Sequence, residues 1–97
     1  MGRNEVLAIL VRHEAELRKR FGVRSLRLFG STARGEAGPH SDVDILIDFV
    51  SPPTLIEFLG VRSFLEDLLS APVDLVTESG LKERARPSVE QDAIRVA

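Results

Sequence analysis

The run LFGSTARG, at residues 28–35, is followed after a short spacer by SDVDILIDF, at residues 41–49, and these two stretches decide the fold. The first predicts the end of a strand, a glycine turn and the start of a short helix. The second predicts a strand with Asp42 and Asp44 at its beginning. Because side chains two residues apart on a strand project from the same face, we expect these two carboxylates to lie side by side.

The glycine turn has the residue types that bind phosphate. Gly30 lets the backbone approach a ligand closely, and Ser31 offers an amide and a hydroxyl at a helix N-terminus. Taken alone, a Gly-Ser turn is more often a simple strand-to-helix connection capped by its serine. Arg34 lies one turn further on, where it would contact a phosphate or a partner, or pair with Asp42 or Asp44.

The two aspartates indicate a magnesium site. Magnesium prefers a few carboxylates, with water and substrate phosphates as its other ligands. Asp42 and Asp44 would hold one ion and leave room for a second about 3.5–4 Å away. Without a cation the two carboxylates would repel each other and resist desolvation, which disfavours a purely structural role. Asp74, between apolar neighbours, offers a third carboxylate if its strand lies beside theirs, whereas Asp48, near the strand end, is expected to be solvated.

The composition indicates one globular domain over residues 1–97, since 43% apolar and 29% charged residues are typical of folded chains of this size. The net charge of −2 and the pI of about 5.7 provide no basic footprint, so we expect no direct nucleic-acid binding. The absence of cysteine excludes disulfides and thiolate metal sites. Because there is no signal-peptide core and no apolar run near the roughly 20 residues of a membrane span, the expected location is the cytoplasm.

Periodicity and turn residues predict the order α-β-α-β-α-β-α, which is an α/β (α+β) class with a small sheet covered by helices. The first helix is capped by Asn4, ends at Gly22 and buries an apolar stripe on which His13 is expected to pack. Thr54 and Glu57 form a capping box for a broadly apolar helix that is expected to pack across the sheet. The approximate elements are helix 4–20, strand 23–29, helix 31–36, strand 43–49, helix 55–70, strand 73–77, helix 80–84 and a final segment 88–96.

The motif residues carry a family resemblance. Gly30-Ser31, ten intervening residues and then Asp42-Val43-Asp44-Ile45 resemble the signature of the DNA polymerase beta-type nucleotidyltransferase superfamily. The fuller pattern Gly-Ser-Thr-Ala-Arg-Gly-x5-Ser-Asp-Val-Asp closely resembles the minimal nucleotidyltransferases, which are often the antitoxin beside a HEPN-domain toxin. The resemblance covers nearly the whole chain, and Asp74 matches the third carboxylate of the family only by its apolar-Asp-apolar setting.

The resemblance implies a nucleotidyltransferase fold, with a mixed, largely antiparallel sheet flanked by helices, and ATP bound through two magnesium ions. By this analogy Asp42 and Asp44 would hold both metals. Asp74 would help to hold the metal beside the incoming hydroxyl. Two metals can stabilise both the attacking and the leaving oxygens, so the reaction would not require a histidine base.

The same analogy assigns the residues that would bind ATP, the donor of the AMP group. Gly30 and Ser31 would hold the β- and γ-phosphates of ATP, with Arg34 nearby. The reaction would be an in-line attack of a hydroxyl on the α-phosphate, with pyrophosphate as the leaving group.

Larger members of the superfamily carry extra domains that bind the acceptor, and nothing after the core corresponds to one here, so we expect the acceptor to be another protein. For HEPN-linked members, the resemblance implies transfer of AMP onto a tyrosine of the partner HEPN toxin, with this chain as the antitoxin in a hetero-oligomer. A second hypothesis stays open, in which the chain neutralises the toxin by direct binding without catalysis. Modification of a small molecule such as an antibiotic is disfavoured, because no acceptor domain is present.

The last segment leaves two further alternatives. Its apolar residues form a candidate docking face, or else they close the core of the domain: Leu81, Val89, Ile94 and Val96. Its basic residues face solvent, a partner or the nucleotide: Lys82, Arg84 and Arg86. The residue types alone do not separate these alternatives.

Overall fold

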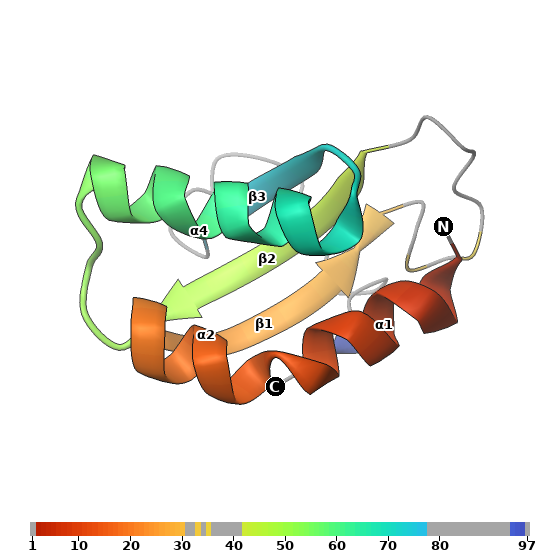
Figure 1. Ribbon diagram of the computed structural model, residues 1–97, viewed down its shortest axis with the longest axis horizontal. Coiled ribbons are helices and arrows are strands. Elements are labelled where there is room, and N and C mark those ends of the chain that lie inside the picture. Colours follow the sequence, from red (N-terminus) through yellow and green to blue (C-terminus); the bar gives the residue numbers. More distant parts are fainter. Residues whose placement is uncertain (1, 31–32, 34, 36–41, 78–93, 97) are drawn as a thin grey trace.

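The computed structural model describes residues 2–30, 33, 35, 42–77 and 94–96, and it forms a mixed sheet with helices against one face (Figure 1). The mixed sheet with flanking helices confirms the predicted fold class. The described elements, in chain order, are α1 (Arg3–Arg12), α2 (Glu14–Phe21), β1 (Val23–Phe29), β2 (Val43–Phe49), α4 (Leu55–Leu69), β3 (Val73–Thr77) and β4 (Ile94–Arg95).

The four strands lie in the order β3-β2-β1-β4. β1 pairs antiparallel with both β2 and β4, and β2 pairs parallel with β3. The parallel pair requires a crossover, which α4 provides by returning along the face of the sheet (Figure 1). β4 was not predicted as a strand, because its two residues carry too short a pattern to be recognised without the β1 partner.

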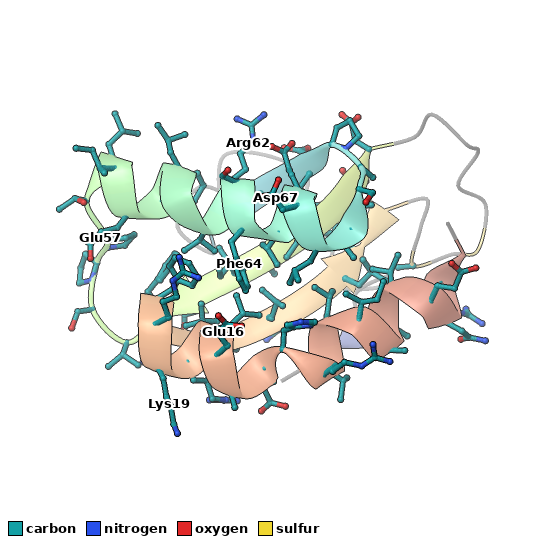
Figure 2. The ribbon with its side chains drawn as sticks, viewed as in Figure 1. Glu16, Lys19, Glu57, Arg62, Phe64 and Asp67 are labelled. Atoms are coloured by element: carbon teal, nitrogen blue, oxygen red, sulfur yellow. The ribbon has the colours of Figure 1, made fainter. Side chains whose placement is uncertain are left out.

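α4 begins with the predicted capping box. The Glu57 amide donates to Thr54 Oγ1 at 3.1 Å, and the Thr54 amide donates to Glu57 Oε1 at 2.9 Å. Figure 2 shows Phe64 pointing from this helix toward α2, where its ring lies 5.2 Å from that of Phe21, and Arg62 pointing away. These opposite directions give α4 one face for the core and one for solvent.

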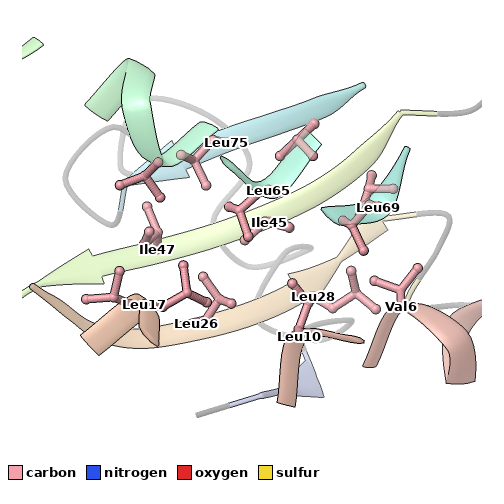
Figure 3. Close-up of a cluster of buried hydrophobic side chains, with 14 of the residues drawn as sticks. Val6, Leu10, Leu17, Leu26, Leu28, Ile45, Ile47, Leu65, Leu69 and Leu75 are labelled. Carbon is pink, nitrogen blue, oxygen red and sulfur yellow. The ribbon is translucent and has the colours of Figure 1, made fainter. Parts of the chain in front are cut away.

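The core lies between the sheet and the three helices. In Figure 3 aliphatic side chains from β1, β2 and β3 meet those of α1, α2 and α4, and burying each contributes about 1.5–3 kcal/mol. The cluster includes Val6, Leu10, Leu17, Leu26, Leu28, Ile45, Ile47, Leu65, Leu69 and Leu75. On the other face of the sheet, Phe29, Leu46 and Val76 form a second buried cluster. β2 is therefore buried on both faces, as its apolar sequence predicts.

The prediction of one continuous first helix is wrong, because the helix is interrupted at His13. The His13 amide donates to Leu10 O at 3.2 Å, and its ring Nδ1 lies 2.9 Å from Ile9 O. The side chain thus occupies the carbonyl that a regular helix would offer to the amide of residue 13. The ring also packs edge-on against Phe64, with centroids 6.4 Å apart, which confirms the expected packing role. The N-cap residue of α1 is Gly2 rather than the predicted Asn4.

The start of α4 departs from expectation as well. Val61, Leu65 and Leu69 are buried and Phe58 packs partly buried against the core, but three other apolar side chains of the first turns are exposed, so the broad stripe packs on the sheet only in part. The exposed fractions are 72% for Leu55, 83% for Ile56 and 46% for Leu59. Gly22 ends α2 with φ +67°, as predicted for a helix-terminating glycine.

Several predictions fall outside the described residues, namely most of helix 31–36, helix 80–84 and the first part of the last segment. Of helix 31–36 only Ala33 and Gly35 are described: Ala33 is helical and buried, and Gly35 is an exposed turn residue. Val96 packs against the core and its amide donates to Leu26 O at 2.8 Å, so this residue helps to close the domain. Within the described part of the chain, no helix is long and apolar enough to cross a membrane.

Candidate active site

The pairing of the strands brings Asp44 and Asp74 into one row. Asp44 of β2 lies opposite Phe29 of β1 on one side and opposite Asp74 of β3 on the other. Directly paired residues project from the same face, and neighbouring strands are about 4.8 Å apart, so the two half-buried carboxylates are neighbours. The condition placed on Asp74, that its strand lie beside β2, is met by the parallel pairing.

Gly30 follows β1 and lies against Asp44. Its φ is +70°, and a Cβ built on it would lie 2.0 Å from Asp44 Oδ2 and 2.9 Å from Asp44 Cγ. No side chain fits at that distance, so the position requires glycine both for its backbone angle and for the space that the carboxylate occupies. The Gly30 backbone and the Asp44 carboxylate therefore form one contiguous surface at the end of β1.

Asp42 precedes β2 and is exposed. With Asp74 it lines a cavity of about 200 Å³, to which α4 contributes Phe58 and Arg62. Asp74 thus connects the other two aspartates, because it lies next to Asp44 in the sheet and lines the same cavity as Asp42. Sequence reasoning missed the two α4 residues, because only the crossover of α4 over the sheet places them beside β3.

The carboxylates fit a magnesium ion that takes part of its ligands from a phosphate substrate. Across residues 2–30, 33, 35, 42–77 and 94–96, no three His, Cys, Asp or Glu side chains are grouped closely enough to hold a metal ion by themselves. Magnesium in nucleotide sites ordinarily takes only one or two carboxylates and completes its shell with phosphate oxygens and water. The half-buried Asp44, beside a glycine that leaves room for a phosphate, has the chemistry for that role.

The other two residues predicted to contact the phosphates of ATP, Ser31 and Arg34, lie outside the described residues. Between them the Ala33 carbonyl accepts a hydrogen bond from Arg3 Nη1 at 3.3 Å, which ties Ala33 to the start of α1. Thirty residues separate that pair, so no local pattern could have indicated it.

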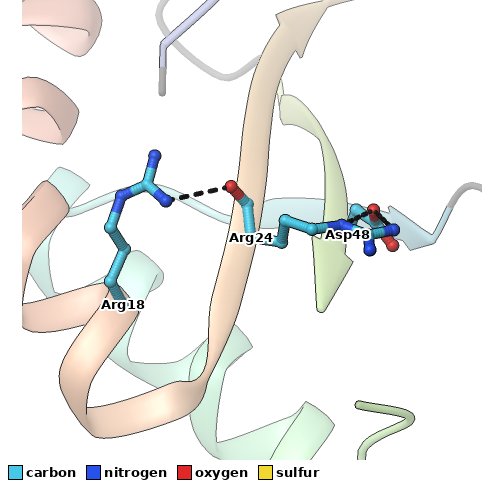
Figure 4. A network of polar contacts seen from close by, with 3 residues as sticks. All are labelled: Arg18, Arg24 and Asp48. Atoms are coloured by element: carbon cyan, nitrogen blue, oxygen red, sulfur yellow. Dashed lines mark hydrogen bonds and ion pairs between the residues drawn. The ribbon is translucent and has the colours of Figure 1, made fainter. Parts of the chain in front are cut away.

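Asp48, expected to be solvated, is instead held in an ion pair, and that expectation is wrong (Figure 4). Arg24 Nε donates to Asp48 Oδ2 at 2.7 Å and its Nη2 contacts the same oxygen, leaving the Asp48 side chain 23% exposed. Arg18 Nη1 donates in turn to the Arg24 carbonyl at 3.2 Å. This pair lies at the far end of β2 from Asp44, so Asp48 is not part of the candidate site.

The beginning of β3 is fixed by α4. The Val73 amide donates to Glu66 Oε2 at 2.9 Å, and Val43 donates to the Pro72 carbonyl at 2.9 Å. These bonds hold the two residues before Asp74, Val73 by α4 and Pro72 by β2, so the approach of the chain to Asp74 is set by a helix and by a neighbouring strand.

Comparison with known proteins assigns this fold and this motif to a family. Residues 10–96 match the nucleotidyltransferase domain family. The chain is 47% identical over 92 residues, 95% of its length and 93% of the relative, to protein adenylyltransferase MntA of Thermococcus cleftensis.

Two solved structures share the fold. One is of a candidate minimal nucleotidyltransferase, with TM-score 0.79 and 39% identity, covering 97% of this chain and 95% of that one. The other is a complex of a tri-AMPylated Shewanella oneidensis HEPN toxin with an MNT antitoxin, matched with TM-score 0.62 and 18% identity over 94% of this chain and 71% of that one. The chain therefore belongs to the nucleotidyltransferase domain family, and the resemblance stated from the motif residues is confirmed.

Proposed function

We propose that this protein is a magnesium-dependent protein adenylyltransferase, which transfers AMP from ATP to a tyrosine hydroxyl of a partner HEPN toxin and so acts as its antitoxin in the cytoplasm. The observation that carries the proposal is the contact of Gly30 with the Asp44 carboxylate in the same row as Asp74. The 47% identity to a protein adenylyltransferase over nearly the full length of both chains supports the choice of acceptor class.

In the proposed reaction the acceptor oxygen forms a bond to the α-phosphorus, while the bond from that phosphorus to the bridging oxygen of the β-phosphate breaks. Pyrophosphate leaves, and the hydroxyl proton passes to water. Asp42 and Asp44 would hold the magnesium ions, Asp74 would lie on the acceptor side, and Gly30 with Ser31 and Arg34 would contact the β- and γ-phosphates. Bound magnesium supplies positive charge that offsets the negative charge on the attacking and leaving oxygens.

The test compares Asp44→Asn with Asp48→Asn, which removes the same charge from the same strand and face but outside the site. Each purified chain is incubated with ATP, magnesium and the HEPN protein encoded beside it, and the intact mass of the HEPN protein is measured. We expect the parent and Asp48→Asn to add one or more AMP units and Asp44→Asn to add none. Transfer by Asp44→Asn at the parental rate would show that the metal assignment is wrong.

Neutralisation by binding alone is the second candidate, favoured by the exposed Leu55, Ile56 and Leu59 on α4. In that case a chain carrying Asp42→Asn and Asp44→Asn would still protect cells from the toxin. Loss of protection by this variant, while it still co-purifies with the toxin, would exclude binding as the sufficient mechanism.

A further inference from the structure

The cavity beside β3 contains more than the two aspartates. On the sheet side it is lined by Asp42, Val73, Asp74 and Leu75, and on the α4 side by Phe58 and Arg62. Its volume of about 200 Å³ is below the roughly 300–1,000 Å³ of pockets that enclose a whole drug-sized ligand, so it has room for a single side chain.

The order of residues across the sheet indicates which substrate enters this cavity. Gly30, on the β1 side, is the proposed contact of the leaving phosphates, and Asp44 stands between it and Asp74 on the β3 side. An in-line displacement places the attacking oxygen opposite the leaving group. The acceptor hydroxyl must therefore approach from the β3 side, where the cavity lies.

We propose that this cavity is the acceptor subsite, in which Phe58 packs against the acceptor tyrosine and Arg62 binds an acidic side chain beside that tyrosine in the partner toxin. This inference rests on the proposed function and deepens it. Arg62 is a positioning residue, because it acts on the acceptor segment rather than on the reacting atoms.

Among the residues that the structure describes, the guanidinium of Arg62 is only loosely engaged. Its side chain is 48% exposed, and its Nε lies 3.9 Å from Glu66 Oε2, an oxygen that already accepts the Val73 amide at 2.9 Å. An exposed ion pair at that distance contributes little, and a guanidinium can bind a further carboxylate through two parallel hydrogen bonds.

The surface next to the cavity fits a protein acceptor. Leu55, Phe58, Leu59 and Arg62 follow the spacing i, i+3, i+4 and i+7, so they share one stripe of α4. Leu55 and Leu59 on that stripe are exposed, which gives the cavity an apolar margin on which the body of a partner protein can pack. The stripe thus joins an apolar contact surface to a polar pocket that opens on the carboxylates.

The test uses Arg62→Ala and Arg62→Lys, with Lys19→Ala as the matched control, since Lys19 projects from α2 on the opposite side of the molecule (Figure 2). AMP transfer is measured with varied HEPN protein at saturating ATP, and then with varied ATP. We expect Arg62→Ala to raise the KM for the HEPN protein by about ten-fold or more, the loss produced by removing one charge-assisted hydrogen bond, with kcat and the KM for ATP nearly unchanged. Arg62→Lys should recover part of the loss, and Lys19→Ala should match the parent.

A second measurement does not depend on transfer. Calorimetric binding of the purified HEPN protein without ATP should be weakened by Arg62→Ala and unaffected by Lys19→Ala, with both variants retaining the parental circular dichroism. If the parent binds the HEPN protein but transfers no AMP, the proposed function fails and this binding comparison decides the inference by itself. An unchanged affinity and KM for the HEPN protein in Arg62→Ala, or an effect confined to the KM for ATP, would overturn the inference.

Discussion

Gly22 and Gly30 have nearly the same backbone conformation, with φ of +67° and +70°, but very different surroundings. A Cβ on Gly22 would meet nothing within 4 Å, whereas a Cβ on Gly30 would overlap the Asp44 carboxylate. Any side chain pays the conformational strain of a left-handed backbone at both positions. Only at Gly30 would it also displace a proposed metal ligand, so the pair separates the effect of strain from the effect on the site.

Gly30→Ala is expected to reduce AMP transfer by about 100-fold, because an ångström-scale displacement of a positioned group has an effect of that order. Gly22→Ala should transfer AMP at close to the parental rate. Both variants should lose about 1–2 kcal/mol of unfolding free energy from the strained backbone. Initial rates of transfer and urea unfolding of the three proteins check this, and equal rates for Gly30→Ala and Gly22→Ala would contradict it.

At the scale of the element, α4 depends on its first turn, because most side chains at that end of the helix are exposed. Thr54 and Glu57 exchange two hydrogen bonds there, satisfying amides that have no partner within the helix. The helix then carries Phe58 and Arg62 to the cavity and Glu66 to the start of β3. The cap is thus the local device that holds one wall of the candidate site.

Thr54→Ala should lower the free energy of unfolding by about 1 kcal/mol, the usual effect of removing a capping side chain. Ser63→Ala, at an exposed interior position of the same helix, should be neutral or slightly stabilising, because alanine is the better helix former. Chemical unfolding at neutral pH measures both. A loss of equal size in the two variants would mean that the cap does not have this role.

The cap also predicts a pH dependence. Two interactions lower the pKa of Glu57 below its ordinary value of 4.5. The larger effect comes from the hydrogen bond that the Thr54 backbone amide donates, and the smaller from the hydrogen bond with the Thr54 side chain. The unfolded chain therefore takes up this proton more readily than the folded one, so the stabilisation is complete above pH 4.5 and is lost as the pH falls through the lowered pKa. Glu57→Gln should lack this pH-dependent part of the stability, because the glutamine side chain does not titrate. The difference in unfolding free energy between parent and variant, followed from pH 6 down to acid, should shrink, and a constant difference would count against it.

At the scale of the whole molecule, one helix contributes both to the core and to an unpaired apolar surface. Leu65 of α4 is fully buried in the cluster between helices and sheet, while Leu55 of the same helix is 72% exposed. Domains of this size are stable by only about 5–15 kcal/mol, so a single buried leucine is a sizeable share of the total. The exposed leucine adds little to folding and is available for a partner.

Leu65→Ala is expected to lower the free energy of unfolding by about 2–5 kcal/mol, through lost burial and the cavity left behind. Leu55→Ala, the same chemical change ten residues earlier, should stay within about 0.5 kcal/mol of the parent. Urea unfolding monitored by circular dichroism gives both values. If Leu55→Ala proved as damaging as Leu65→Ala, α4 would pack differently from the arrangement described.

The sequence was sufficient to predict β1, β2 and β3 with their observed bounds, because each is a run of alternating or continuous apolar residues closed by glycine or proline. It failed at His13, where a side chain competes with the helix for the Ile9 carbonyl, and at β4, which is too short to be recognised alone. It also failed at Asp48, whose partner Arg24 lies on another strand. Each failure involves a partner that periodicity does not encode.

The sequence by itself was sufficient to indicate the proposed chemistry, because Gly30, Asp42 and Asp44 sit in one short motif that predicts a glycine turn and two carboxylates on one face of a strand. The tertiary structure decided which other residues join them. The parallel register of β3 brings Asp74 opposite Asp44, and the crossover of α4 adds Phe58 and Arg62 to the cavity. Such contacts arise from the packing of whole elements on a common core, which depends on surfaces distant in the chain, whereas a local motif depends only on backbone geometry.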